Sequence, residues 1–351
     1  MTILAIETSC DETACAVVED GTKVLAAQVA SSAEMHLATG GIVPEVAARR
    51  QVDFMVPVLE ATLAQLTQEQ TLDAVAVTVG PGLVGSLIVG IEAAKALALA
   101  WHKPILPVNH LVGHIYANFI DSGGAHANAE DVFPAVALVV SGGHTDLVLM
   151  RAHGDLHYLG GTLDDAAGEA FDKVARLLQL GTYLGGATLA KTARDYAGPV
   201  IPEKLPRALL HDTTYNFSFS GLKTATKRLV DKGLYPIPAI AQEFEKAVID
   251  VLVAKTAQAA KATHAKSILL GGGVSANQHL RQELVAVMRS QNSAVRVHIP
   301  PAAQCTDNAA YIASAAYFYA KHGKSSVCPF ANITPNPALT IMTSLSDGSF
   351  C

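Results

Sequence analysis

Ala135-Val-Ala-Leu-Val-Val140 leads directly into Ser141-Gly-Gly-His-Thr145, and this stretch decides the predicted fold. Its first six residues have the uninterrupted apolar character of a buried strand, and the glycine turn leads into a return strand at Leu147-Val-Leu-Met150. The same order occurs near the N-terminus, where Ile3-Leu-Ala-Ile-Glu-Thr8 is followed by a polar turn and a second strand, Ala14-Cys-Ala-Val-Val18. The sequence therefore predicts a duplicated structural unit.

The elements that follow these two stretches also recur in one order. Each half continues with a third strand, a helix, a strand that ends in glycines, a second helix, another strand and a last helix. In the first half, the expected elements in this order are the strand 23–29, the helix 45–66, the strand 74–79, the helix 83–100, the strand 105–108 and the helix that follows it. In the second half they are the strand 156–159, a helix from 165, the strand 267–270, a helix after 277, the strand 295–299 and a helix over about 307–322. Such halves describe an α/β fold of two domains with one ancestry.

We expect the first domain at 1–128 and the second at 129–351, joined by the low-complexity stretch 121–129. The second domain contains an extended helical insertion at about 186–263. Its last helix is a candidate to pack back on the first domain. A chain of 351 residues, half of them hydrophobic, has enough apolar material for two packed cores.

Charge and cysteine content restrict the function classes. The net charge is −6, and no stretch combines clustered lysine and arginine with aromatics. This argues against free-standing, high-affinity nucleic-acid binding, but it allows a nucleic-acid substrate held weakly or with a partner protein. The five cysteines are an odd number and include no C-x-x-C pair, so we expect a protein of the reducing cytoplasm without a disulfide framework. The opening residues do not resemble a signal peptide, and the apolar run 83–101 carries Glu92 and Lys95, so a buried helix is expected there.

Two histidines, His110 and His114, stand where the strand 105–108 gives way to a predicted helix. Residues at i and i+4 lie on one helical face, so the two imidazoles can converge on one ion. The spacing is that of the metalloprotease signature H-E-x-x-H, but Leu111 occupies the place of the glutamate that acts as general base. The pair predicts either a metal that holds or polarises a ligand, or two histidines satisfied by backbone and water.

The duplication adds a third candidate ligand. The place in the second half that corresponds to the histidine pair, after the strand 295–299, carries Cys305-Thr-Asp-Asn308. If the halves face each other across a cleft, Asp307 lies opposite the histidines. Two imidazoles and one carboxylate leave open coordination positions, which suits Fe(II) or Zn(II). The alternative role for Asp307 is a helix N-cap, for which Thr306 competes.

Four glycine-rich turns are expected at the carboxyl ends of predicted strands, at 80–85, 141–145, 184–186 and 271–277. Glycine lets a backbone approach a phosphate closely, and a following helix directs its N–H groups at an anion. The turns predict a nucleotide in a cleft between the domains, with tight turns between packed elements as the alternative. None fits the P-loop pattern, and 80–85 matches the Rossmann spacing only loosely.

Acidic residues add candidates for the same cleft. Asp165, Glu169 and Asp172 share one helical face, where a carboxylate can accept hydrogen bonds from ribose hydroxyls. A solvated face, or N-terminal charges that complement the helix dipole, is the alternative and is favoured for Asp165. Glu12 is either a charged cleft residue or a turn residue.

Nine ordered segments resemble a known family over nearly the full length of the chain. They are Ile6-Glu-Thr-Ser-Cys-Asp-Glu-Thr13, Gly40-Gly-Ile-Val-Pro-Glu45, Gly80-Pro-Gly-Leu-Val-Gly85, His110-Leu-Val-Gly-His114, Val140-Ser-Gly-Gly-His-Thr145, Asp164-Asp-Ala-Ala-Gly-Glu-Ala-Phe-Asp-Lys173, Phe217-Ser-Phe-Ser-Gly-Leu-Lys223, Gly271-Gly-Gly-Val-Ser-Ala-Asn277 and Cys305-Thr-Asp-Asn308. The pattern resembles the universal tRNA threonylcarbamoyladenosine synthase subunit of the Kae/Qri/TsaD family, formerly called glycoproteases or O-sialoglycoprotein endopeptidases. The first segment is similar to the bacterial branch.

The resemblance implies the actin/hexokinase/Hsp70-type (ASKHA) fold, with duplicated domains around a nucleotide cleft. It implies transfer of the threonylcarbamoyl group from threonylcarbamoyl-AMP to N6 of adenosine 37 in tRNAs that read codons beginning with A, with release of AMP. It makes His110, His114 and Asp307 the ligands of one divalent metal ion, Fe(2+) first and Zn(2+) second. The adenylate-binding positions that match are Val139, Val140, Ser141, Gly142, Gly143, Asp172, Gly186 and Asn277.

Catalytic assistance and partners are less defined. Glu12 and His144 are both candidates for proton removal, and the sequence does not decide between them. The resemblance implies tRNA, a paralogous subunit of the same fold (TsaB-like) and a small ATPase (TsaE-like) as partners, with a cytoplasmic location and no membrane.

The family usually has Tyr-Pro-Gly-Gly where this chain has Tyr183-Leu-Gly-Gly186, and losing the proline is expected to loosen that turn. Asn109 replaces a common histidine, and the tail after Pro335 matches no family segment.

Three other function classes stay open at this point. A metalloprotease is disfavoured by Leu111 in place of the catalytic glutamate and by the surplus of glycine turns. A sugar kinase or ATPase of the same fold would need an aspartate base for a substrate hydroxyl. A nucleotide-binding scaffold, like a degenerate bacterial paralogue of the family, would lack the histidine pair that this chain has.

Overall fold

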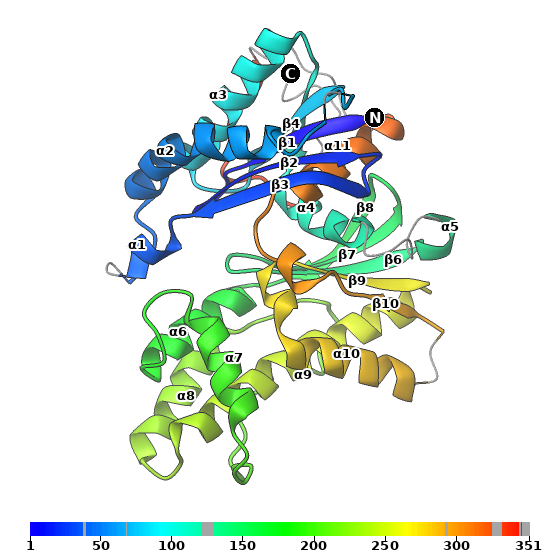
Figure 1. Cartoon of the computed structure of the whole chain (residues 1–351). Helices are drawn as coiled ribbons and strands as arrows, with labels where there is room; N and C mark the ends of the chain where they lie inside the picture. The colour runs from blue at the N-terminus through cyan, green and yellow to red at the C-terminus, as the bar shows by residue number, and fades with distance from the viewer. Residues whose placement is uncertain are drawn as a thin grey trace. The chain divides into compact units, whose positions relative to one another are not determined.

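The computed structural model describes residues 1–37, 40–67, 69–120, 129–291, 294–324, 332–343 and 345. Its contacts divide the chain into two compact units. Unit 1 comprises Met1–Ala129, Ala152–Leu156 and Pro300–Cys351, and unit 2 comprises Glu130–Arg151 and His157–Ile299 (Figure 1). The expected linker, apart from its last residue, and the end of the C-terminal tail lie outside the described residues.

Unit 1 is built on a five-stranded sheet in the order β3-β2-β1-β4-β5. The strands are β1 (Thr2–Glu7), β2 (Glu12–Glu19), β3 (Lys23–Ser31), β4 (Ala74–Gly80) and β5 (Ile105–Asn109). β2 runs antiparallel to β1 and β3, whereas β1, β4 and β5 are parallel neighbours. Every residue of β1, β4 and β5 is buried, which is why these strands are apolar without alternation. The edge strand β3 is largely exposed.

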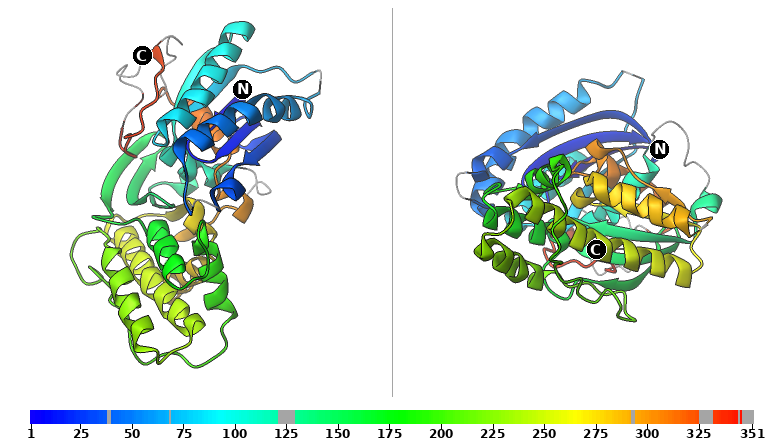
Figure 2. Two further views of the ribbon diagram at one scale, coloured as in Figure 1. Left: turned by 90° about the vertical axis from the view of Figure 1, so that its left-hand side faces the viewer. Right: turned by 90° about the horizontal axis from the view of Figure 1, so that it is seen from below.

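Helices cover both faces of this sheet (Figures 1 and 2). The helices of unit 1 are α1 (Ala33–Leu37), α2 (Pro44–Leu63), α3 (Val84–Trp101), α4 (His110–Tyr116), the short η1 (Ala117–Phe119) and η3 (Ala302–Gln304), and α11 (Ala310–Lys321). α2 packs on α3, β2 and β3, and α11 packs on α4, β1, β2 and β5. α3 is the one helix of the described residues that is long and apolar enough to cross a membrane, but Leu87, Ile91 and Ala94 lie in the core of unit 1.

Unit 2 repeats the same sheet, in the order β10-β9-β6-β7-β8. The strands are β6 (Ala135–Val140), β7 (Thr145–Ala152), β8 (Asp155–Gly161), β9 (Ser267–Gly271) and β10 (Arg296–His298). β6 pairs antiparallel with β7 and parallel with β9, and β9 pairs parallel with β10. The topology thus follows unit 1 strand by strand, and the predicted duplicated α/β fold is confirmed.

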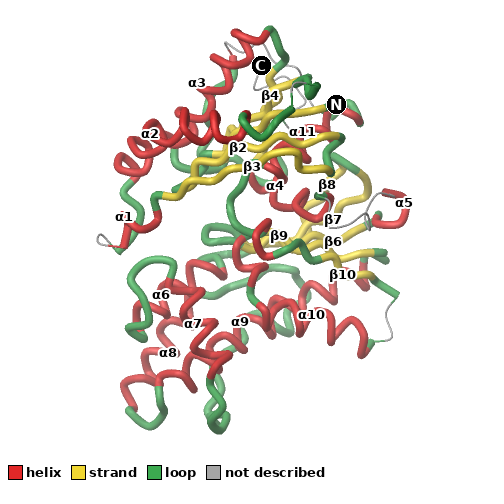
Figure 3. Tube along the Cα trace, viewed as in Figure 1, coloured by secondary structure: helices red, strands yellow, loops and turns green. Residues whose placement is uncertain are grey.

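The expected insertion at about 186–263 contains three of the helices of unit 2, α7, α8 and α9 (Figure 3). The helices of unit 2 are α6 (Ala167–Leu177), α7 (Gly185–Asp195), α8 (Ser220–Lys232), α9 (Ile237–Ala262), the short η2 (Gly273–Ala276) and α10 (Gln278–Ser290), while α5 (Ala129–Val132) precedes the sheet. A loop joins α7 to α8, so the insertion is not continuously helical. α9 forms the centre of the core and contacts α6, α7, α8, α10, β6 and β9.

The turn between β7 and β8 belongs to unit 1. Its His153 is 4% exposed and stacks on Phe318 with ring centroids 4.1 Å apart. The Tyr116 hydroxyl lies 3.0 Å from Nδ1 of His153. Burial, together with the positive charges of His322 and Lys321, lowers the pKa of His153 to about 3, so its ring is neutral at physiological pH.

Candidate functional site

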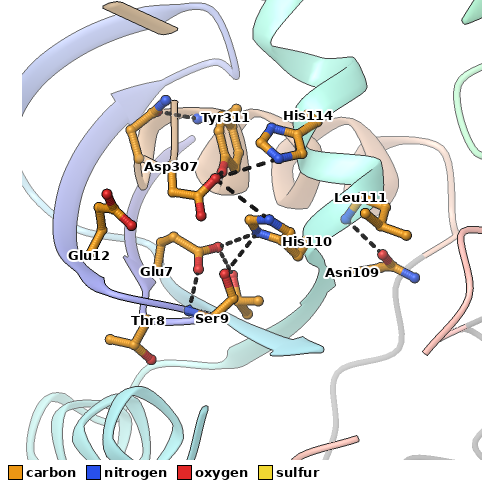
Figure 4. Close-up of polar contacts among 12 residues, drawn as sticks. Glu7, Thr8, Ser9, Glu12, Asn109, His110, Leu111, His114, Asp307 and Tyr311 are labelled. Atoms are coloured by element: carbon orange, nitrogen blue, oxygen red, sulfur yellow. Dashed lines mark hydrogen bonds and ion pairs between the residues drawn. The ribbon is translucent and has the colours of Figure 1, made fainter. Parts of the chain in front are cut away.

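The histidine pair lies at the start of α4, directly after β5. The side chain of Asn109 accepts a hydrogen bond from the Leu111 backbone N–H at 2.9 Å and so caps the helix. His110 and His114 follow one turn apart, 8% and 1% exposed, with ring centroids 4.5 Å apart. The predicted convergence of the two imidazoles on one face is therefore present (Figure 4).

Asp307 joins the histidines from the segment before α11. Its Oδ1 lies 3.7 Å from Nε2 of His110 and 3.5 Å from Nε2 of His114. The three ligand atoms lie within 4.8 Å of one another, close enough to hold one metal ion. Two imidazoles and a carboxylate suit a divalent transition metal and leave positions open for a further ligand.

The route by which Asp307 reaches the histidines differs from the expected one. We expected it to face them from the second half of the chain, but the segment from Pro300 onward is part of unit 1. Asp307 is also not the helix cap: Oδ1 of Asn308 accepts from the backbone N–H groups of Ala310, at 3.0 Å, and Tyr311, at 3.3 Å. Unit 1 thus supplies all three candidate ligands.

The sequence analysis missed two residues of this centre. Glu7, at the end of β1, is fully buried, and its Oε2 lies 3.0 Å from Nδ1 of His110. It also accepts hydrogen bonds from the Ser9 N–H and the Thr78 hydroxyl, both at 2.5 Å. A carboxylate on one imidazole nitrogen orients the other nitrogen toward a metal. The Tyr311 hydroxyl donates to Asp307 at 3.3 Å. For Glu7, the sequence did carry a signal, because a glutamate at the end of an apolar strand needs a specific partner.

Crowded carboxylates set the electrostatics of the centre. Burial raises the pKa of Asp307 to about 6, and burial together with the Asp307 charge raises the pKa of Glu12 to about 10. Against the effect of burial, the Glu7 and Asp307 carboxylates raise the pKa of His110 to about 9. A concentration of negative groups around two imidazoles fits a bound cation. With a pKa of about 10, the Glu12 carboxyl is protonated at neutral pH and cannot accept a proton. A bound cation would favour the ionised carboxylate, so a general-base role for Glu12 would need such a cation.

The glycine turn after β4 serves packing. A Cβ at Gly82 would overlap the backbone oxygen of Ser9, and a Cβ at Gly80 would overlap that of Asn336. The Leu83 N–H donates to the same Ser9 oxygen at 2.8 Å. The tight-turn alternative therefore accounts for this turn, which fixes the loop after β1 beside the histidine centre.

The predicted adenylate-binding residues all lie in unit 2. Val139 pairs with Gly271 across β6 and β9, so the stretches that follow the two strands start side by side. Val139 and Val140 are fully buried, whereas Gly142 and Gly143 are exposed and have open space around them. This combination offers backbone groups to a ligand without obstruction by side chains.

α6 begins against the same turn. The Gly168 N–H donates to the Ser141 oxygen at 3.2 Å, and the backbone N–H of His144 donates to the Ser141 hydroxyl at 3.2 Å. One helical turn past Gly168, Oδ1 of Asp172 accepts from the Gly186 N–H at 2.8 Å. Asp172 and Gly186 are thus brought together, as are Ser141 and His144. Burial raises the pKa of Asp172.

Leu184 gives the turn before α7 a backbone that proline could not adopt. Its φ is +49°, in the left-handed region, which proline cannot adopt because its ring fixes φ near −65°. Gly186 is still held in place by Asp172.

Two repeats of one five-stranded sheet, each with its own helices, are the architecture of an ASKHA-type fold. Among solved structures, the chain is similar to HypF from T. kodakarensis, with a TM-score of 0.62 and 13% identity over 92% of this chain and 48% of that one. It is also similar to component A of (R)-2-hydroxyglutaryl-CoA dehydratase from Acidaminococcus fermentans, with a TM-score of 0.50 and 13% identity over 91% and 97% of the two chains. These similarities confirm the fold.

The family follows from sequence comparison. Residues 23–314 match the family model of TsaD, described as tRNA N6-adenosine threonylcarbamoyltransferase. The chain is 50% identical to the Thermomicrobium roseum protein of that name, over 92% of this chain and 93% of the relative, and 48% identical to the Bacillus subtilis one, over 90% and 89%. The chain belongs to the TsaD family. The predicted resemblance is confirmed, and with it the prediction of an enzyme of the transferase class.

Proposed function

We propose that this enzyme transfers the threonylcarbamoyl group from threonylcarbamoyl-AMP to N6 of adenosine 37 in tRNAs that read codons beginning with A, and that it does so in the cytoplasm. The observation that carries the proposal is the convergence of His110, His114 and Asp307 in a chain of this family. A centre without the H-E-x-x-H glutamate suits an already activated donor, which needs no metal-bound hydroxide.

The reaction requires orientation and charge stabilisation. The N6 amine attacks the carbamoyl carbon, the bond from that carbon to the phosphate oxygen of AMP breaks, and N6 loses a proton. Fe(2+), or alternatively Zn(2+), would polarise the carbamoyl carbonyl when held by His110, His114 and Asp307. Glu7 orients His110, and the glycine turns of unit 2 bind the adenylate. Glu12 and His144 remain the candidates to take the proton.

Charge distribution supports tRNA contact through unit 2. Unit 2 contains 18 lysines and arginines against 15 aspartates and glutamates, a net charge of +3, whereas unit 1 contains 7 against 16, a net charge of −9. Phosphate groups are attracted to the former and repelled by the latter. A surplus of three charges is small, so we propose that a TsaB-like paralogue and a small TsaE-like ATPase assist the positioning of tRNA.

Replacing one ligand tests the proposal. His110→Ala should abolish both bound metal, measured by elemental analysis of the purified protein, and formation of the modified adenosine, measured by nucleoside mass spectrometry of tRNA. His211→Ala, at an exposed position of unit 2, is the matched control and should change neither. Full transfer activity in His110→Ala would show that the metal has no central role.

A further inference from the structure

A buried carboxylate stands in the central helix of unit 2. Glu245 lies in α9, is 4% exposed, and has apolar or alanine neighbours at most other buried positions of that helix. Burying a carboxylate is costly unless specific partners compensate it. The contacts of Glu245 therefore indicate why it is there.

Both carboxylate oxygens of Glu245 contact the loop and helix after β9. Oε1 accepts a hydrogen bond from Nδ2 of Asn277 at 2.7 Å. Oε2 lies 3.2 Å from Nδ1 of His279. Neither partner belongs to α9, so Glu245 joins the central helix to the start of α10.

The side chain of Asn277 is held at both ends. Its Oδ1 accepts from the Leu280 N–H at 3.0 Å and caps α10, while its Nδ2 donates to Glu245. With the oxygen and one amide hydrogen engaged, the amide cannot rotate without losing both bonds, and the second Nδ2 hydrogen keeps a fixed direction.

The loop that carries Asn277 is itself fixed against β6. Gly272 has φ +89°, and a Cβ there would overlap the backbone oxygen of Val140. Nε of Arg281 donates to the Ser275 oxygen at 2.6 Å, which ties α10 back to η2. Asn277 is thus held in a defined place relative to the turn that follows Val140.

We propose that Glu245 is a positioning residue for the adenylate: it aims the free amide hydrogen of Asn277 at the bound nucleotide and keeps that amide from turning. The inference rests on the proposed function, which assigns Asn277 to adenylate binding. Preorganisation of this kind improves affinity because the ordering of the side chain is completed before the ligand arrives.

The test measures binding of AMP to the full chain by titration calorimetry. Glu245→Leu should weaken AMP binding about fivefold, the effect of one net hydrogen bond. Glu245→Gln keeps an oxygen for Asn277 and an amide opposite Nδ1 of His279, so it should stay within about twofold of the parent. Glu283→Gln is the matched control, because Glu283 also lies near His279, at 3.8 Å, and no contact joins it to Asn277.

A double-mutant cycle separates positioning from a general structural effect. If Glu245 acts through Asn277, Glu245→Leu adds nothing in an Asn277→Ala background. An equal loss in both backgrounds, or no loss in the single variant while Asn277→Ala weakens binding, overturns the inference. Unchanged AMP binding in Asn277→Ala would instead refute the adenylate assignment on which it rests. Should Glu245→Leu not fold, as judged by thermal melting, Glu245→Ala takes its place in the cycle.

Discussion

Units 1 and 2 share one sheet topology, but the ends of their central strands carry different chemistry. β1 ends in Glu7, a buried carboxylate that contacts His110, whereas β6 ends in Val140, whose backbone oxygen lies against Gly272. Unit 1 therefore gathers side-chain ligands, and unit 2 presents backbone and open glycines. The comparison shows how one α/β repeat can gather titratable side chains in one copy and open glycine turns in the other.

The difference extends to how each site is completed. The candidate metal cluster is completed by Asp307, which lies in the segment after Pro300. This segment belongs to unit 1, although it follows unit 2 in the sequence. The predicted adenylate residues lie between positions 139 and 277, and all of that stretch except the turn Ala152–Leu156 belongs to unit 2. If the two sites are independent, a change in one should leave ligand binding in the other intact.

The largest expected effect comes from the glycine that packs on β6. Gly272→Ala should destabilise unit 2 by about 3 kcal/mol, because the new Cβ adds a steric overlap to a positive φ. It should abolish AMP binding in calorimetry while metal content stays at the parent level. Gly221→Ala, on α8 of the same unit, is the matched control, since it is exposed and open space surrounds that position. Loss of metal from Gly272→Ala would contradict the independence of the sites.

A smaller effect is expected from the carboxylate behind His110. Glu7→Gln keeps the size of the side chain but removes the charge that orients the imidazole. Metal affinity, measured by chelator competition, should fall about 10- to 100-fold, while AMP affinity should not change. Glu19→Gln, on β2 and paired with Lys23, removes an acid from the same unit and should leave metal affinity intact. Parent-level metal affinity in Glu7→Gln would remove Glu7 from the centre.

The buried His153, which stacks on Phe318 in unit 1, predicts that the stability of the protein depends on pH. The pKa of His153 is about 3 in the folded chain and about 6.5 when unfolded, so the unfolded state gains a proton first as the pH falls. The stability that the neutral ring contributes is present above pH 6.5 and is lost toward pH 3. Between pH 7 and pH 5 the loss should be about 2 kcal/mol.

Thermal melting over this pH range measures the effect. His153→Phe keeps an aromatic ring against Phe318 but cannot take up a proton, so its melting temperature should fall less between pH 7 and pH 5 than that of the parent. Parallel pH profiles for the two proteins would mean that another group dominates acid unfolding.

Much of both units could be predicted from local sequence patterns. The strand Ala135–Val140 was predicted with its observed bounds, and the i, i+4 spacing placed His110 and His114 on one helical face. These features depend on periodicity over a few residues, which the sequence displays directly. The repeated order of elements was sufficient to predict the fold class.

Long-range partners could not be predicted in this way. The contact of Glu7 with His110 joins positions 103 residues apart, and no local pattern specifies it. The same holds for the return of Asp307 to unit 1 and for the pairing of Glu245 with Asn277. At the start of α11, Asn308 took the capping role that had been weighed for its neighbours, because several adjacent polar residues can each cap a helix.

The smallest expected effect concerns the opposite charges of the two units. α8 exposes Lys223 and Arg228 on unit 2, whereas Arg49 is exposed on α2 of unit 1. If tRNA phosphates contact unit 2, Lys223→Gln with Arg228→Gln should weaken binding of a tRNA transcript a few-fold and reduce the slope of log affinity against log salt by about 2. Arg49→Gln should leave the slope unchanged. An effect of Arg49→Gln alone would place the RNA on the acidic unit, against the long-range repulsion that its net charge of −9 imposes.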